Sequence, residues 1–168
     1  MESLIAVLDQ ESGLYEDLLK QSSAKTPVII SGDLDRLAAI TDEEQRIVEK
    51  LANLEKERQQ SMKDIANVLN KDVQTLTITD LIALLGKRPA EAKALAEGRD
   101  RLKAVAGRVR LVNEQNQELL RSSLEMVQFE MNIIQASKAA PETANYTRRA
   151  GAAGETIGYT AGGFDAKQ

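Results

Sequence analysis

The sequence predicts an all-α protein: an elongated antiparallel bundle of three main helices, a short extra helix and a flexible C-terminal tail. Three observations support this prediction. Only 3% of the residues are aromatic and none is tryptophan, so the core has to be aliphatic, as in helical bundles. Apolar residues recur at alternating steps of three and four over long stretches, which is the helical period. The apolar and charged fractions, 42% and 29%, are typical of a chain that can bury a core.

The first helix is expected over residues 2–22. Its apolar residues share one helical face, at Leu4, Ile5, Leu8, Tyr15, Leu18 and Leu19. We expect the helix to end before Pro27, because proline lacks a backbone donor and disfavours helical backbone in the residue before it. The serine and threonine residues that precede Pro27 strengthen this expectation.

A second helix is expected over residues 33–70. Either Ser31 or Asp33 can cap its first turn, because both side chains accept hydrogen bonds from free backbone N–H groups. The positions at three-four spacing are Leu34, Leu37, Ile40, Glu44, Ile47, Leu51, Leu54, Arg58, Ser61, Ile65 and Val68. Burial of the apolar members, at roughly 1.5 to 3 kcal/mol each, outweighs the surface ion pairs.

The pattern stops after residue 70 and resumes at Pro89. A short helix is expected near residues 79–85, with Thr79 as its cap and Gly86 ending it in the left-handed conformation. Pro89 then begins the third main helix, residues 89–138, at a position where a missing N–H costs nothing. At 1.5 Å per residue this helix would be about 75 Å long, so long neighbours must lie beside it.

The second half of this helix carries two apolar rows. One continues a coiled-coil-like seam, at Leu102, Val105, Val109, Val112, Asn116, Leu119, Ser123, Met126 and Ile133. The other lies beside it, at Leu120, Leu124, Val127, Met131 and Ile134. Periodicity alone favours core packing for the second row, and the alternative is an open groove for a partner helix. For Asn116 we favour a role in setting the register between helices over direct contact with a partner.

The composition changes after Lys138. Residues 1–138 are expected to form one helical domain, and residues 139–168, which hold five of the ten glycines, a mobile Ala/Gly-rich tail. The larger apolar residues of the tail are either incidental or docking points, and they are Tyr146, Ile157, Tyr159 and Phe164.

Several function classes are disfavoured by composition. The chain has no histidine and no cysteine, which removes the commonest general base and the commonest transition-metal ligands. The paired carboxylates, such as those of residues 42–44, belong to a charged helix, and we expect them to be exposed to solvent. We therefore expect no enzyme, no metal and no cofactor.

The charge pattern also bears on partners and location. A net charge of −4 disfavours nucleic acid. No run of 18 apolar residues exists, so we expect no insertion into a membrane. The first ten residues lack the basic region and apolar run of a secretory signal, and the expected location is the cytoplasm.

Two stretches carry a resemblance to a known family. The sequence ISGDLDRLAAITDEEQRIV, residues 30–48, continued by LANLEKER, residues 51–58, resembles the second helix of FlgN-type flagellar export chaperones. The second stretch is NEQN, residues 113–116, with LLRSSL, residues 119–124, and YTRR further on, at residues 146–149.

The resemblance extends from about Leu4 to Gly151. It implies a cytosolic, non-enzymatic type III secretion chaperone that binds hook–filament junction (hook-associated) proteins, prevents their premature assembly and delivers them to the export gate. In that family the C-terminal part of the long helix and the tail hold the substrate. Tyr146 best matches the family's gate-docking tyrosine, and Tyr159 is the alternative.

The combined prediction of partner-binding residues comprises Asn116, Leu120, Leu124, Val127, Met131, Ile134 and Tyr146. The competing hypothesis is a structural coiled-coil protein that self-associates through its long C-terminal helix. Weak homo-oligomers are compatible with either hypothesis.

Overall fold

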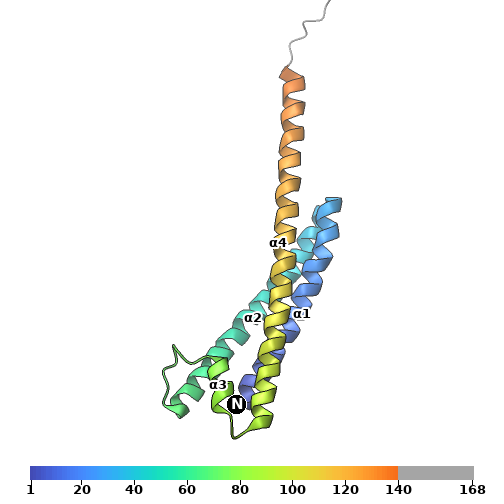
Figure 1. Cartoon of the computed structure of the whole chain (residues 1–168). Helices are drawn as coiled ribbons and strands as arrows, with labels where there is room; N and C mark the ends of the chain where they lie inside the picture. The colour runs from blue at the N-terminus through green and yellow to red at the C-terminus, as the bar shows by residue number, and fades with distance from the viewer. Residues whose placement is uncertain (140–168) are drawn as a thin grey trace, which may run out of the picture. The chain divides into compact units, whose positions relative to one another are not determined.

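The computed structural model describes residues 1–139, and every regular element among them is an α-helix. The helices in Figure 1 are α1 (Glu2–Ser31), α2 (Leu34–Leu69), α3 (Ile78–Leu84) and α4 (Pro89–Ala139). By its internal contacts the chain divides into two units, Met1–Phe129 and a second unit that begins at Glu130. The first unit contains α1, α2, α3 and most of α4. The predicted all-α helical bundle is confirmed.

Helix α1 is longer than predicted, and the end expected near residue 22 is wrong. The helix continues through Pro27 for four more residues. Pro27 costs a backbone hydrogen bond, but the next turn is anchored by Val28 and Ile29, each only 4% exposed. Ser22, which suggested a break, is buried and donates its hydroxyl to Oε1 of Glu44 in α2 at 2.7 Å. Contacts between helices therefore decide where α1 ends.

The turn from α1 to α2 consists of Gly32 and Asp33. Gly32 has a φ of 68°, a left-handed conformation that favours glycine, and its N–H donates to the carbonyl of Ile29 at 3.2 Å. The carboxylate of Asp33 accepts from the N–H of Arg36 at 3.0 Å. Of the two predicted caps, Asp33 is the one that caps α2. The helix ends as predicted, with Asn70 as its C-cap.

Helix α3 begins at a different cap from the one predicted. Thr77, not Thr79, is its N-cap, and its hydroxyl accepts from the N–H of Asp80 at 3.1 Å. The carboxylate of Asp80 accepts in return from the N–H of Thr77 at 2.9 Å, which completes a capping box. The prediction that Gly86 adopts the left-handed conformation is also wrong, because its φ is not positive. Pro89 is the first residue of α4, as predicted.

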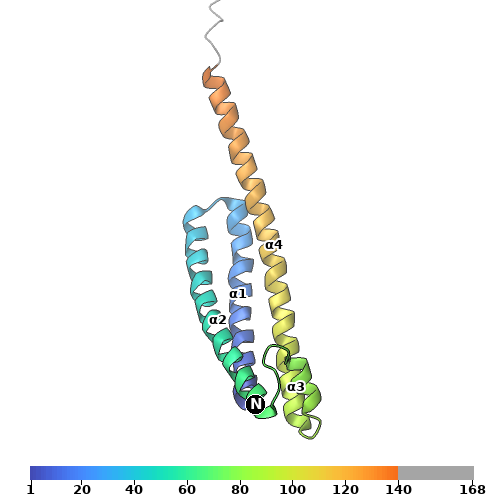
Figure 2. The ribbon, with the colours of Figure 1, turned by 90° about the vertical axis from the view of Figure 1, so that its left-hand side faces the viewer.

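Helices α1 and α2 run antiparallel, and α4 runs parallel to α1 (Figure 2). Arg101 of α4 pairs with Asp9 of α1 at 3.2 Å between Nη1 and Oδ1. Further along, the hydroxyl of Thr26 donates to Oδ1 of Asn116 at 2.7 Å. Partners on α1 and α4 are thus about 90 positions apart in the sequence.

The core of the first unit is aliphatic, in keeping with the low aromatic content. One buried cluster joins α1, α3 and α4 through Leu4, Leu8, Leu81 and Leu95. A second joins α1, α2 and α4 through Leu18, Ile47 and Val109. At Gly98 an added Cβ would lie 3.5 Å from Cβ of Leu8, so this side of α4 packs directly against α1.

Candidate partner-binding surface

Helix α4 is packed along the predicted seam as far as Leu119. Its buried or half-buried seam residues are Leu102, Val105, Val109, Val112, Asn116 and Leu119. Packing was also expected for Ser123, Met126 and Ile133, and that expectation is wrong, since all three are exposed. Ser123 and Met126, which belong to the first unit, are exposed because α1 is too short to reach them. Its last residue, Ser31, is level with about Arg121 of α4 if partners lie about 90 positions apart.

Asn116 is the polar residue of this seam, and it is only 4% exposed. Its Nδ2 donates to the backbone carbonyl of Ser22 at 2.7 Å, while its Oδ1 accepts from the hydroxyl of Thr26 at 2.7 Å. Both ends of the amide are therefore used between α1 and α4. This geometry favours the register role over partner contact. Asn116 does not lie with the exposed residues of the second row.

From Arg121 to Lys138 every residue of α4 is exposed. We call this stretch the exposed segment. Its large apolar side chains are Leu124, Met126, Val127 and Phe129 in the first unit, and Met131, Ile133 and Ile134 in the second. They are half of the fourteen exposed large apolar side chains among the described residues, although the segment is short. Such a concentration of exposed apolar surface makes this segment the candidate interaction site.

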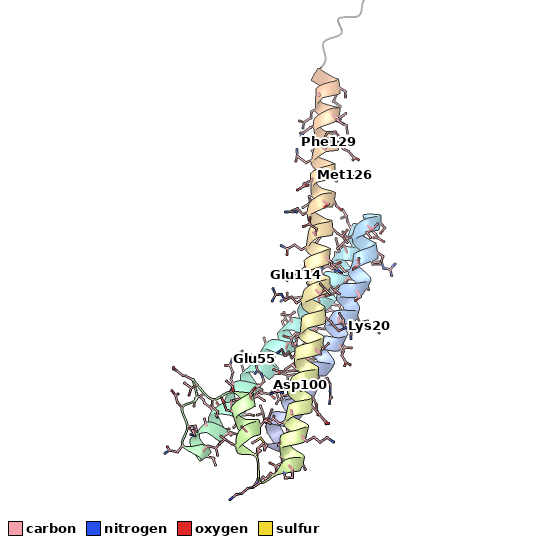
Figure 3. The ribbon with its side chains drawn as sticks, viewed as in Figure 1. Lys20, Glu55, Asp100, Glu114, Met126 and Phe129 are labelled. Atoms are coloured by element: carbon pink, nitrogen blue, oxygen red, sulfur yellow. The ribbon has the colours of Figure 1, made fainter. Side chains whose placement is uncertain are left out.

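Figure 3 places Met126 and Phe129 on a part of α4 that has no other helix of the first unit beside it. Leu124 is 69% exposed and Val127 52% exposed, so the core alternative for the second row fails at these two positions. Leu120, the first residue of that row, is half-buried at the edge of the bundle. Met131 and Ile134 are exposed within the second unit.

Phe129 is a candidate that the sequence rows missed. It is 63% exposed, yet it belongs to neither predicted row. Its spacing in the sequence, three residues after Met126 and four before Ile133, could have indicated that it shares a helical face with them. Tyr146 and Tyr159 lie outside the described residues, as does the predicted tail apart from its first residue.

One cavity of the described residues lies elsewhere. It has a volume of about 760 Å³ and is formed by the end of α2, by α3 and by the segment leading to α4. Val68 and Leu84 line it and are themselves exposed. None of the predicted partner-binding residues contributes to it. We locate the candidate site by the exposed apolar residues of α4, because a helix-binding surface need not be a deep cavity.

One buried ionic cluster joins α1 to α2. Glu11 is only 3% exposed, its Oε1 lies 3.2 Å from Nε of Arg58, and its Oε2 has no hydrogen-bond partner. Burial raises the pKa of Glu11, and Arg58 offsets this effect only partly. Glu55 also pairs with Arg58. Burial alone would raise the pKa of Glu55, but hydrogen bonds from Arg58 and Gln59 outweigh this effect, so the pKa of Glu55 is lowered overall. This cluster connects two bundle helices.

The described residues contain no group of histidine, cysteine, aspartate and glutamate side chains arranged to hold a metal ion. None of the described helices is both long enough and apolar enough to cross a membrane.

The comparison with protein families decides the assignment. A family model described as FlgN protein matches residues 1–154, which is nearly the whole chain. The chain belongs to the FlgN family. FlgN proteins are flagellar export chaperones, and the family is not known for enzymatic activity. No curated protein and no solved structure matches the chain. The FlgN match covers the exposed segment and Tyr146 as well as the helical bundle.

Proposed function

We propose that this FlgN-family chain acts in the cytoplasm as a chaperone for hook–filament junction proteins, which it holds unassembled and delivers to the export gate. The observation that carries the proposal is the exposed segment of α4, with seven large apolar side chains between 49% and 69% exposed. A bundle that only had to be stable would gain nothing from these residues. Binding to amphipathic helical segments of a partner could bury such residues.

The amount of apolar surface is sufficient for specific binding. Full burial of a leucine, methionine or phenylalanine side chain contributes roughly 1.5 to 3 kcal/mol, and a half-exposed side chain can still gain part of this. The four such residues of the first unit can together offset the lower part of an association cost of about 4 to 15 kcal/mol. Met126 and Met131 suit a surface that accepts more than one partner sequence, because methionine adapts to irregular neighbours.

A second candidate function is self-association as a structural coiled coil. It is favoured by the seven-residue spacing of Leu119, Met126 and Ile133, which is the heptad period. Both candidates use the same helix, so they must be separated by experiment.

The test mixes the purified full chain with candidate junction proteins and, as a comparison, with filament protein. Size exclusion with light scattering then gives the mass of each complex. We expect a soluble complex with the junction proteins alone. Stable self-assembly without binding to junction proteins would instead favour the structural coiled coil.

Point variants locate the surface. Leu124→Asp and Met131→Asp should weaken junction-protein binding and leave the helical circular dichroism signal unchanged, since both residues are exposed. Gln117→Asp is the matched control, because it adds the same carboxylate to an exposed position of α4 before the exposed segment. If Leu124→Asp unfolds the protein, the residue belongs to the core and the surface is misplaced.

The proposed docking residue for the export gate is Tyr146. Tyr146→Ala should retain junction-protein binding and reduce export of that protein from flagellated cells. Tyr159→Ala is the matched comparison, since the family resemblance leaves the two tyrosines as alternatives. Normal export by the Tyr146 variant would remove this residue from the proposal.

A further inference from the structure

The face of α4 that packs on α1 continues beyond the end of α1. At Gly98 an added Cβ would lie 3.5 Å from Cβ of Leu8, and Asn116 forms two hydrogen bonds with α1. A helix turns by about 100° per residue, so Gly98 and Asn116, which are 18 residues apart, point in the same direction. Ser123 and Val127 fall within about 20° of that direction. The line of α4 that contacts α1 therefore runs on through these two residues.

Helix α1 leaves this line near Ile30. The hydroxyl of Thr26 donates to Asn116, and Ile30 and Leu120 follow these two residues by four positions each. Because α1 and α4 run parallel (Figure 2), Ile30 and Leu120 are level with each other. Leu120 is half-buried, whereas Ile30 is 70% exposed and Val127 is 52% exposed. Among the described residues of the first unit, the place that α1 fills beside Asn116 is thus unfilled beside Val127.

Four residues of α4 form a hole in this place, of the kind that receives one side chain of a neighbouring helix. Such holes are bounded by four residues of the facing helix, at positions i, i+3, i+4 and i+7. Here they are Leu120, Ser123, Leu124 and Val127. Three are aliphatic and Ser123 is small, which leaves room for an aliphatic side chain. The hydroxyl of Ser123 donates to the carbonyl of Leu119 at 2.9 Å, so a neighbour can cover it without breaking a hydrogen bond.

The end of α1 limits which helix can lie there. A helix that packs on Ser123 along the line of α1 must end at Ile30, because α1 occupies the line beyond that residue. A second copy of this chain with its α4 parallel to this one does not fit, since its α4 continues back to Pro89 and would run into α1. The place therefore suits a helix that ends there.

We infer that an amphipathic helix of the partner lies end to end with α1 along α4, with one aliphatic side chain in the hole around Ser123 and its end against Ile30. This inference rests on the proposed function, in which the partner is a junction protein. It adds Ser123 and Ile30 to the partner-binding residues and gives the position of the bound helix. All of the residues that carry it belong to the first unit. The partner helix then continues the interface that α1 forms with α4.

Filling the hole tests whether a side chain enters it. Ser123→Leu places a large side chain in the hole, whereas the matched control Ser123→Ala removes the hydroxyl and leaves the hole open. Calorimetry gives the affinity of each full-length variant for a junction protein. Circular dichroism checks the helix, which both replacements favour over serine. We expect Ser123→Leu to weaken binding by at least about tenfold, because the hole becomes overpacked, and Ser123→Ala to bind as the parent chain does.

The sign of the Ser123→Leu effect decides between a hole and a general apolar surface. If the partner required apolar area alone, the added leucine would enlarge that area and strengthen binding. Unchanged or stronger binding by Ser123→Leu would therefore overturn the inference. Equal weakening by Ser123→Ala would overturn it as well, since the hydroxyl and not the hole would then be recognised.

Leu124→Asp separates this inference from the proposed function. If Leu124→Asp weakens binding of a junction protein and Ser123→Leu does not, the inference fails while the proposed function stands. If neither variant weakens binding, the exposed segment is not the docking surface and both fail. If no junction protein binds the parent chain, the proposed function fails and the inference fails with it.

Ile30→Asp tests where the partner helix ends. We expect this variant to weaken binding by at least about fivefold, because it places a charge against the end of an apolar contact. Val68→Asp is the matched control: Val68 is also β-branched and exposed, at 86%, but it lies near the opposite end of α2 from the turn that follows Ile30. Equal binding by the two variants would show that the partner helix does not reach the end of α1.

Crosslinking tests whether one helix spans the whole place. A photo-crosslinking amino acid is introduced at Ile30 in one sample and at Val127 in another, and the crosslinked peptides are identified by mass spectrometry. We expect both positions to reach one continuous helical segment of the partner. Two separate partner segments would overturn the inference. Crosslinks between two copies of this chain would also overturn it, since they would indicate self-association with antiparallel α4 helices.

Discussion

The amide nitrogen of Asn116 donates to the backbone carbonyl of Ser22 at 2.7 Å, which joins two residues that are 94 positions apart in the sequence. The same side chain accepts from the hydroxyl of Thr26. This buried amide thus ties α4 to α1 at one position along their length.

Asn116→Leu should lower the free energy of unfolding by about 1 to 3 kcal/mol, because the hydroxyl of Thr26 loses its acceptor and the carbonyl of Ser22 loses a donor in a buried site. Denaturant titration measures this difference. Asn113→Leu is the matched control, since Asn113 is exposed on the same helix. Equal stability of the two variants would show that the Asn116 bonds contribute nothing measurable.

Glu11→Gln should remove a stability loss that the parent chain shows as pH rises. The pKa of Glu11 in the folded chain is raised above the unfolded value of about 4.3. Between these two values the folded state binds more protons than the unfolded state, so stability falls with rising pH. The variant minus parent difference in unfolding free energy should therefore increase across this window and level off above the folded pKa.

Chemical unfolding of both chains at a series of pH values measures this difference. Glu55 contributes in the opposite sense: its lowered pKa adds stability that is lost as pH falls below about 4.3. Glu55→Gln is accordingly the comparison variant: it should be less stable than the parent chain above about pH 4.3, and this difference should shrink as pH falls below that value. A difference between Glu11→Gln and the parent chain that does not change with pH would contradict the raised pKa.

Pro27→Ala should stabilise the protein, because α1 continues through this position and alanine restores the missing N–H donor. Proline costs about 3 kcal/mol relative to alanine inside a helix. About 0.4 to 1 kcal/mol of the gain is lost to the greater freedom of the unfolded chain. We expect a rise of up to about 2 kcal/mol in denaturant titration. A fall in stability would mean that the proline conformation is required where α1 passes it.

Thr77→Ala should destabilise the chain by about 0.5 to 2 kcal/mol, the usual loss for an N-cap. Thr77→Ser keeps a hydroxyl in the same place and should retain most of the stability. Hydrogen exchange of the α3 amides, followed by NMR, reports the local effect. If Thr79→Ala exposes these amides more than Thr77→Ala does, the cap has been assigned to the wrong threonine.

Much of the fold could be predicted because the apolar residues of a long helix recur in the sequence at the helical spacing of three and four. The bounds of α2 and α4 follow from three-four spacing, from Pro89 and from the residues around Asn70. The end of α1 could not be predicted in this way. Local chemistry at Pro27 indicates a break, whereas the deciding contacts, such as Ser22 with Glu44, join helices far apart in the sequence.

The candidate surface was predictable only in part. The second row indicated surplus apolar residues, but periodicity cannot tell a packed row from an open one. The difference depends on where α1 stops relative to α4, which is a property of the assembled bundle. For the same reason Met126 was expected in the seam, and Phe129 was not selected at all. The domain boundary at residue 138 and the roles of Tyr146 and Tyr159 stay predictions.

The two-residue turn at Gly32 and Asp33 also bears on the order in which the chain folds. Hydrogen bonds between α1 and α2 join residues 19 to 58 positions apart, whereas those between α1 and α4 span about 90 positions and carry a larger closure entropy. During synthesis the α1–α2 hairpin can form before the ribosome has made α4. The apolar residues of the exposed segment emerge from the ribosome after all residues of α1, α2 and α3, so the α1–α2 hairpin can form before this segment is available to a partner.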